Sequence, residues 1–141
     1  MRTHTEEIIS PYSVEQLYSL VSDVDKYPEF IPWCAAARVR ERNERDILAD
    51  LVVGFKGINE TYTSRVHLKE REIDIEYING PFEVLENNWK FTALENGTKI
   101  NFYIKFRFRS KLLQALIGGL FEAACHKMVA AFTERAKKLY G

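Results

Sequence analysis

The chain has 141 residues, 46% of them hydrophobic and 13% aromatic, and its 20 basic and 20 acidic side chains give a formal net charge of zero. This length suffices for one hydrophobic core, so we expect a single domain over residues 1–141. Proteins dedicated to nucleic acids carry an excess of Lys and Arg, so the charge balance argues against that class.

Three features bear on the cell compartment. Cys34 and Cys125 form neither a disulfide framework nor a CxxC pair, which indicates a reducing compartment. The amino terminus carries two glutamates and no apolar segment, so we expect no signal or transit peptide. The longest apolar run, residues 115–121, is far shorter than the ~20 residues of a membrane-spanning helix. The sequence predicts a cytoplasmic protein.

The first elements are a weak strand and a short helix. Residues 2–9 alternate only weakly and are a candidate first strand. Ser13 and Gln16 have the spacing of a capping box, in which each side chain bonds to the backbone of the other. Apolar residues follow at helical spacing, which predicts an amphipathic helix over residues 14–23.

The next segment, DVDKYPEFIPWC at residues 23–34, is apolar but contains two prolines. Pro28 and Pro32 limit a helix here to at most one turn, because proline lacks an amide hydrogen and disfavours helical backbone at the residue before it. We expect a short, rigid lid over the open end of the sheet.

The aromatic side chains of this lid are Tyr27, Phe30 and Trp33. We expect them to pack on the carboxy-terminal helix near the glycines at 118–119, where the backbone can come close. The lid is either a plug that seals the core or a gate that guards a ligand cavity, and the sequence leaves both open.

From residue 36 to 108 apolar side chains recur at every second position, the period of a strand with one buried face. The clearest alternating runs cover residues 47–55, 61–68, 73–77, 89–93 and 100–108. Turn signals stand at residues 43–44, 56–57, 70–71, 79–81 and 96–97. Asn96-Gly97 is the favoured dipeptide of a two-residue hairpin. Such short connections predict an antiparallel meander.

The chain ends in a long amphipathic helix, with apolar residues every three or four positions from 112 to 140. Gly118 and Gly119 interrupt the pattern, so the helix kinks there or begins afresh. One sheet and one helix, each with an apolar face, bury both faces only by packing together. The sequence predicts an α+β fold in which a curved antiparallel sheet of six to seven strands wraps the terminal helix.

The sequence contains no recognisable catalytic arrangement, phosphate loop or metalloprotease motif. We expect His67 to pair across the sheet with Asp74 or Glu76. Glu122 and His126 are four residues apart on one helix face and could bind a metal, but no second ligand pair accompanies them, so a surface ion pair is the favoured interpretation. We predict no catalytic residue, no metal site and no required cofactor.

A basic stripe at the end of the last strand comprises Lys105, Arg107, Arg109 and Lys111. It could contact anionic lipid headgroups or ribosomal RNA. The zero net charge favours the alternative, a solvated sheet face whose cations pair with acidic neighbours.

The predicted interior is rich in large apolar side chains. They form either a packed core or the wall of a cavity between sheet and helix that suits a hydrophobic small molecule. The candidate cavity and lid residues are Tyr27, Phe30, Trp33, Tyr77, Phe82, Trp89, Phe91, Phe102, Phe106, Leu116, Leu120, Phe121 and Met128. The pattern alone does not choose between these two interpretations.

Two motifs carry a resemblance to a known family. They are Y-P-x-F-x-P-W-C over residues 27–34 and G-P-F-x₆-W-x-F over residues 80–91, and shorter matches extend the likeness nearly end to end. The chain resembles the coenzyme Q-binding protein family of the START-like (polyketide cyclase/lipid transport) superfamily, whose bacterial members include ribosome-association toxin A relatives.

The resemblance implies a helix-grip fold, with two short helices after the first strand, and one START-like lipid-binding domain. It implies non-enzymatic binding of ubiquinone or a related polyprenyl lipid, in support of quinone synthesis or respiratory electron transport. It also implies transient contact with a membrane surface or with quinone-synthesis proteins, a place in the cytoplasm or peripheral to the inner membrane, and no DNA partner.

Within this resemblance the role stays open. Ala37 stands where relatives carry a serine, which leaves the ligand undecided, whereas Trp33 favours the quinone-binding branch because the toxin-like members lack it. The alternative is a ribosome-associated protein that binds the large subunit and inhibits subunit joining. A cyclase or dehydratase is a third possibility, disfavoured because the inward faces offer few ionisable groups.

Overall fold

The computed structural model describes residues 3–55, 57–118 and 120–141. Lys56 of the turn expected at 56–57 and Gly119 of the expected helix interruption therefore lie outside the described residues. The elements, in chain order, are β1 (Thr3–Ser10), α1 (Val14–Ser22), the 3₁₀ helix η1 (Val24–Glu29), β2 (Cys34–Arg42), β3 (Asp46–Phe55), β4 (Ile58–Lys69), β5 (Glu72–Asn79), β6 (Phe82–Leu94), β7 (Gly97–Phe108), α2 (Lys111–Gly118) and α3 (Phe121–Tyr140).

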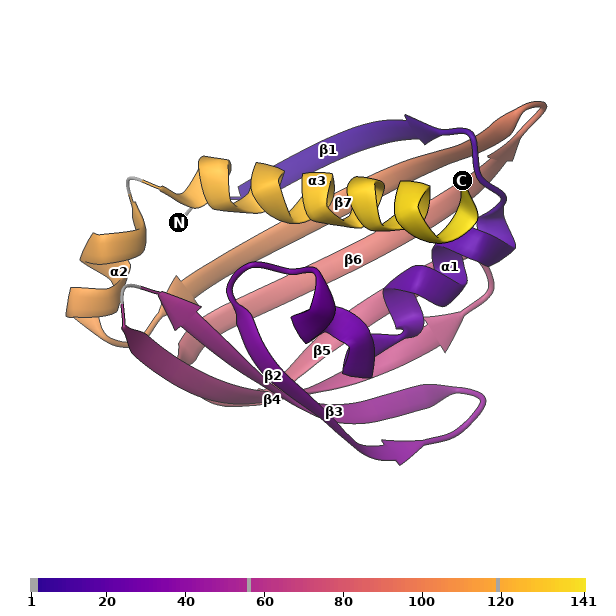
Figure 1. Cartoon of the computed structure of the whole chain (residues 1–141). Helices are drawn as coiled ribbons and strands as arrows, with labels where there is room; N and C mark the ends of the chain where they lie inside the picture. Colours follow the sequence, from indigo (N-terminus) through magenta and orange to yellow (C-terminus); the bar gives the residue numbers. More distant parts are fainter. Residues whose placement is uncertain (1–2, 56, 119) are drawn as a thin grey trace.

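Seven strands form one antiparallel sheet in the order β1-β7-β6-β5-β4-β3-β2. The strands from β2 to β7 follow one another as a meander, and β1 joins beside β7. The sheet curves around α3, while α1 and η1 lie on the same side of the sheet (Figure 1). The predicted α+β, helix-grip architecture is confirmed.

Helix α1 begins where the sequence predicts. The Ser13 hydroxyl accepts a hydrogen bond from the Gln16 amide at 3.1 Å, and the Gln16 side chain accepts one from the Ser13 amide at 3.0 Å. Together they satisfy two backbone donors that would otherwise lack partners at the helix start. The apolar face of α1 is buried in the core.

The segment that follows differs from its prediction. Instead of at most one turn, it forms a six-residue 3₁₀ helix that contains Pro28. A 3₁₀ helix has three residues per turn and a φ range that includes the fixed φ of proline, so Pro28 costs it little more than one hydrogen bond. The helix ends before Pro32, where the amides of Phe30 and Ile31 both donate to the Tyr27 carbonyl.

The carboxy-terminal helical pattern divides into two helices. Helix α2 ends at Gly118 and α3 starts at Phe121, so the helix begins afresh rather than kinking. The α3 side chains that are buried lie three or four residues apart, and they face the sheet and α1: Phe121, Cys125, Val129, Phe132 and Ala136. None of the helices in the described part of the chain is both long and apolar enough to cross a bilayer.

The hairpin between β6 and β7 exists, but its loop is Glu95-Asn96 rather than Asn96-Gly97, because Gly97 already pairs with Leu94. Gly97 allows the backbone of β7 to lie close to the end of β1. A Cβ atom at Gly97 would overlap the carbonyl oxygen of Ser10, and the residue has φ +152°. The prediction of a hairpin was right and the assignment of its turn residues was wrong.

Candidate functional site

Two adjoining chambers lie between the sheet and α3. The inner chamber has a volume of about 90 Å³ and the outer chamber about 260 Å³. Trp33, Tyr62, Ile104 and Met128 are among the side chains that line both. The outer chamber approaches the ~300–1,000 Å³ of typical ligand pockets. The interior is therefore hollow here rather than completely filled.

The inner chamber contains polar groups but no ionised ones. Among the described residues no Asp, Glu, His, Lys or Arg side chain lines it. Burial raises the pKa of the Tyr27 and Tyr62 hydroxyls and raises that of the Cys34 thiol to about 11. These groups are therefore neutral near pH 7. Ser64 also lines this chamber, and it is only 1% exposed.

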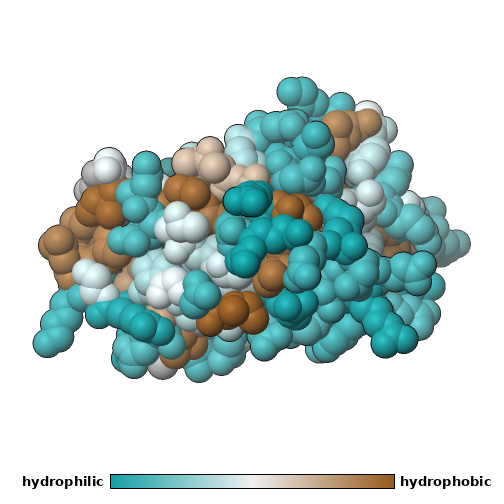
Figure 2. All heavy atoms as spheres, turned by 90° about the horizontal axis from the view of Figure 1, so that it is seen from below, coloured by the Kyte–Doolittle hydropathy of each residue, from teal (hydrophilic) through white to brown (hydrophobic). Residues whose placement is uncertain are grey.

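The outer chamber is apolar, with charge confined to two residues. Phe82, Phe106 and Leu120 contribute to its walls, and Glu60 and Lys127 are its charged members among the described residues. An apolar surface continues at the end of the molecule where α2 lies, the left end in Figure 2. The most exposed large apolar side chain there is Leu112, at 66%.

The structure places part of the predicted site around these chambers. The predicted residues that line one or both are Tyr27, Trp33, Phe82, Trp89, Phe106, Leu120 and Met128. Both the lid segment and the terminal helix contribute side chains to these walls.

Four predicted residues lie outside the walls of the two chambers. Phe102 is buried with its ring centroid 4.6 Å from that of Trp89, and Phe121 is buried 4.8 Å from Phe106. Phe91 packs beside α1 instead, 5.7 Å from Tyr18. The remaining one, Leu116 on α2, is not part of either chamber wall.

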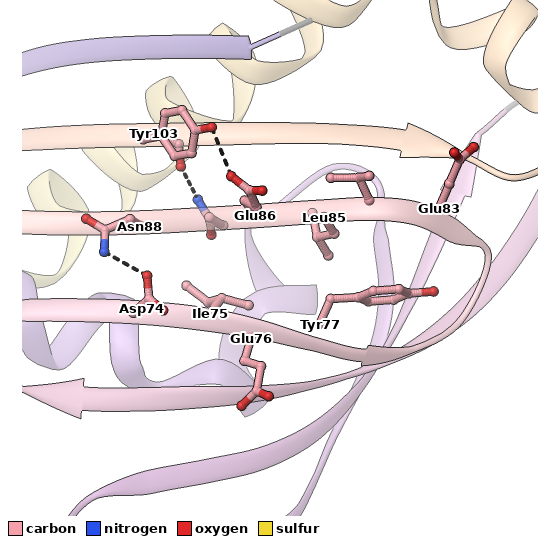
Figure 3. Close-up of a pocket in the computed structure, with 11 residues that line it drawn as sticks. Asp74, Ile75, Glu76, Tyr77, Glu83, Leu85, Glu86, Asn88 and Tyr103 are labelled. Atoms are coloured by element: carbon pink, nitrogen blue, oxygen red, sulfur yellow. Dashed lines mark hydrogen bonds between the residues drawn. The ribbon is translucent and has the colours of Figure 1, made fainter. Parts of the chain in front are cut away.

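Tyr77 lies in a different hollow, between β5 and β6 (Figure 3). Pairing between these strands ends at Glu76 and Glu86, beyond which they diverge. The Tyr77 hydroxyl accepts a hydrogen bond from the Phe82 amide at 3.0 Å. This hollow, of about 550 Å³, is an open groove, and Glu83 on its rim bonds to Arg107. It is more open to solvent than the two chambers.

Phe30 corrects the expected position of the lid. Its ring lies 5.1 Å from Phe132 in an edge-on contact, and Tyr27 contacts the same ring at 5.4 Å. Tyr27 and Phe30 therefore pack on the middle of α3 rather than near residues 118–119 as expected, whereas Trp33 lines both chambers. An ion pair between Arg135 and Glu29, 2.7 Å long, holds this part of the lid there.

Several cavity residues escaped the sequence analysis. Ser64 and Asn87 are polar, yet they occupy inward positions on β4 and β6 and line the inner chamber. A polar residue that breaks an otherwise apolar strand face was the available signal. Other wall residues absent from the predicted set are Val24, Ile31, Cys34, Leu51, Val53, Tyr62, Val66, Ile75, Leu85, Ile104 and Phe132.

The histidine rings contact carboxylate side chains. His67 pairs with Glu76 at 2.8 Å, as predicted. His126 faces Glu6 of β1 at 3.3 Å rather than Glu122, because β1 runs beside α3. In residues 3–55, 57–118 and 120–141 no three His, Cys, Asp or Glu side chains gather to hold a metal ion.

The basic stripe is partly engaged within the sheet. Arg107 bonds to Glu83, and the Arg109 Nε donates to the Phe82 carbonyl at 2.9 Å. Lys105 stands opposite Glu86 in the register of β7 and β6. This arrangement fits the favoured interpretation of a sheet face with acidic neighbours.

Comparison with known proteins gives relatives over the whole chain. A ribosome association toxin RatA from Rickettsia prowazekii is 41% identical over 141 residues, which cover 96% of this chain and 95% of the relative. The mitochondrial coenzyme Q-binding protein COQ10 of Drosophila melanogaster is 32% identical, over 99% of this chain and 60% of that protein. The relative named for ribosome association is more similar in sequence to this chain than the relative named for coenzyme Q binding. Trp33 had led us to expect the reverse.

Solved structures agree on the fold. The solution structure of an 18 kDa protein from Caulobacter crescentus is 35% identical, with a TM-score of 0.77 over 100% of this chain and 99% of that one. The relatives above are named for association or binding, whereas the family description also includes cyclases and dehydrases. Residues 10–133 match that description. The chain belongs to the polyketide cyclase/dehydrase and lipid transport family, which confirms the predicted resemblance to the polyketide cyclase/lipid transport superfamily.

Proposed function

We propose that this protein acts by association with the ribosome. The observation that carries the proposal is the near end-to-end similarity to proteins named ribosome association toxin RatA, at 41% identity for the relative from Rickettsia prowazekii. The specific partner expected from the sequence is the large subunit, and the expected effect is inhibition of subunit joining.

Contact with ribosomal RNA requires cations that are free to meet phosphates. The exposed side chains of Lys127, Lys137 and Lys138 on α3 meet that requirement better than Arg107 and Arg109, which are engaged within the sheet. We therefore place the proposed contact on the exposed side of α3.

Co-sedimentation with purified subunits tests this proposal. We expect the protein to sediment with the large subunit, and to lose most of that binding when Lys137 and Lys138 are both changed to Glu. The matched control reverses the charges of Lys90 and Lys99, which lie on the sheet. Failure to sediment with either subunit at moderate salt would refute the association, and equal loss in both double variants would refute its placement on α3.

As a second function, we propose that the chambers bind ubiquinone or a related polyprenyl lipid without chemical conversion. The largely apolar cavity supports this proposal, and so does similarity to a protein named for coenzyme Q binding. A general acid or base must lie within reach of a reacting group. The inner chamber offers none that titrates near neutral pH among the described residues.

Organic extraction of protein purified from cells, followed by mass spectrometry, tests the second function. We expect a polyprenyl lipid in the native protein and none in Ala124→Phe, which fills the outer chamber. The same substitution at Ala130, exposed on α3, is the control. Absence of any such lipid, together with no binding of added ubiquinone, would refute this function.

A further inference from the structure

The inner chamber contains a buried polar group with nothing to bond to. Ser64 lies on β4, is 1% exposed, and its Oγ has no hydrogen-bond partner in the described structure. A buried hydroxyl without a partner destabilises a protein, and native structures rarely keep one without a reason.

Two other buried hydroxyls of the sheet do have hydrogen-bond partners. Thr63, the residue before Ser64, points to the opposite face and donates to Asp50 at 2.6 Å. Thr98, fully buried on β7, donates to the Tyr12 carbonyl at 2.8 Å. The cross-strand neighbours of Ser64 are Ala49 on β3, which has no polar side-chain atom, and Tyr77 on β5, whose hydroxyl bonds to the Phe82 amide instead. The Ser64 Oγ is therefore free to form a hydrogen bond with a group that enters the chamber it lines.

The chamber also restricts the charge of what can reach Ser64. The ionisable groups of its wall are the hydroxyls of Tyr27 and Tyr62 and the thiol of Cys34, and they are neutral near pH 7. An ionised head group would be buried there without a counter-charge, which is strongly unfavourable. The charged residues Glu60 and Lys127 line the other chamber.

Size sets a further limit. The inner chamber, at about 90 Å³, is smaller than the roughly 150 Å³ cavity known to admit benzene. It suits the slim end of a chain better than a substituted ring.

We propose that Ser64 anchors a neutral oxygen, a hydroxyl or carbonyl, at the slim end of an otherwise apolar ligand. The apolar remainder fills the outer chamber, and any charged part lies toward Glu60 and Lys127. This inference rests on the lipid-binding function proposed above and narrows its ligand. It favours polyprenyl lipids whose slim end carries a neutral oxygen over hydrocarbons, over ionised lipids and over ubiquinone, whose oxygens lie on a substituted ring.

Three probes of one chain length test the preference: farnesol, the hydrocarbon farnesene and, at pH 8, ionised farnesoic acid. Each is titrated as a competitor of the fluorescent apolar dye N-phenyl-1-naphthylamine. We expect farnesol to bind about fivefold or more tightly than farnesene, the gain from one hydrogen bond. Ser64→Ala should remove that difference and leave farnesene unchanged. Farnesoic acid should bind at least about tenfold more weakly than farnesol.

Thr98→Val is the matched control, since it removes a buried hydroxyl outside the chambers. It should lower the melting temperature and keep the preference for farnesol, whereas Ser64→Ala should not lower the melting temperature because its hydroxyl has no partner to lose. Equal affinities for farnesol and farnesene, or an unchanged preference in Ser64→Ala, would overturn the anchor. Farnesoic acid binding as tightly as farnesol would overturn the requirement for neutrality. If no probe displaces the dye, the lipid-binding function itself fails.

Discussion

The Arg135 guanidinium donates a hydrogen bond to the Glu29 carboxylate across 2.7 Å and also lies over the Phe30 ring, 5.1 Å from its centroid. One side chain of α3 thus holds the end of η1 and the ring that follows it. Two other aromatic residues of the same lid, Tyr27 and Trp33, line the cavity. The lid is therefore a plug at Phe30 and a cavity wall at its other aromatic positions.

The first prediction concerns this attachment. Arg135→Met should lower the free energy of unfolding by about 1–2 kcal/mol, because it removes a charge-assisted hydrogen bond and a cation–π contact from a side chain that is 12% exposed. Glu29→Gln should cost less, about 0.5–1 kcal/mol, since Glu29 is half exposed. Urea denaturation measures both. An Arg135→Met variant as stable as the control Lys138→Met would contradict the attachment.

The second prediction separates the plug from the wall. Phe30→Ala should destabilise the protein by about 2–3 kcal/mol, because it leaves Phe132 and Tyr27 without their edge-on partner. The lipid affinity of the folded fraction should stay within about twofold of the unchanged protein. Trp33→Ala should weaken lipid binding more than about fivefold, because Trp33 lines both chambers. Scanning calorimetry measures the stability of each variant, and titration calorimetry with farnesol measures its affinity. Normal stability with weakened binding in Phe30→Ala would show that Phe30 guards the cavity.

The third prediction concerns the two thiols. Burial raises the pKa of Cys34 to about 11 and of Cys125 to about 12. At pH 8 their alkylation by iodoacetamide should be at least about 100-fold slower than that of a free cysteine, since the thiolate is the reactive form. The folded state holds these protons more tightly than the unfolded state, so the free energy of unfolding should fall as pH rises from 9 toward 11. Rapid alkylation at pH 8, or stability that rises over this interval, would contradict the burial of these thiols.

The fourth prediction concerns the approach of β1 to the β6–β7 hairpin. Gly97→Ala should lower the free energy of unfolding by about 2 kcal/mol or more, because the added methyl group overlaps the Ser10 carbonyl and φ is +152°. Asn96→Ala, in the loop itself, is the matched control and should cost under about 1 kcal/mol. Thermal unfolding of the two variants gives the comparison, and equal losses would show that the approach to Ser10 is not close.

Much of the fold follows from hydrophobic period alone, and the exceptions have identifiable reasons. Strand β2 shows little burial and forms an edge of the sheet, so its sequence has no clear alternation. The first half of β6 holds Glu86, Asn87 and Asn88, and pairing with β7 rather than apolar alternation makes it a strand. The glycines at positions 118 and 119 predicted either a kink or a new helix start, and the sequence did not choose between these two outcomes.

The cavity was less predictable than the fold. Alternation indicates which side chains face inward, but it does not indicate which of them leave space between them. Phe102 and Phe121 are inward and packed, whereas Phe106 and Met128 border a hollow. Tyr77 lies outside the cavity because β5 and β6 stop pairing near it, a local divergence that sequence period does not reveal.

The central claim is that the space between sheet and α3 receives a ligand. The chain has two methionines, and Met128 lines both chambers. Protein labelled with ¹³C at the methionine methyl groups therefore provides a direct measurement by NMR titration with farnesol. We expect a saturable shift of the Met128 signal. An unchanged Met128 signal at saturating farnesol would contradict the claim.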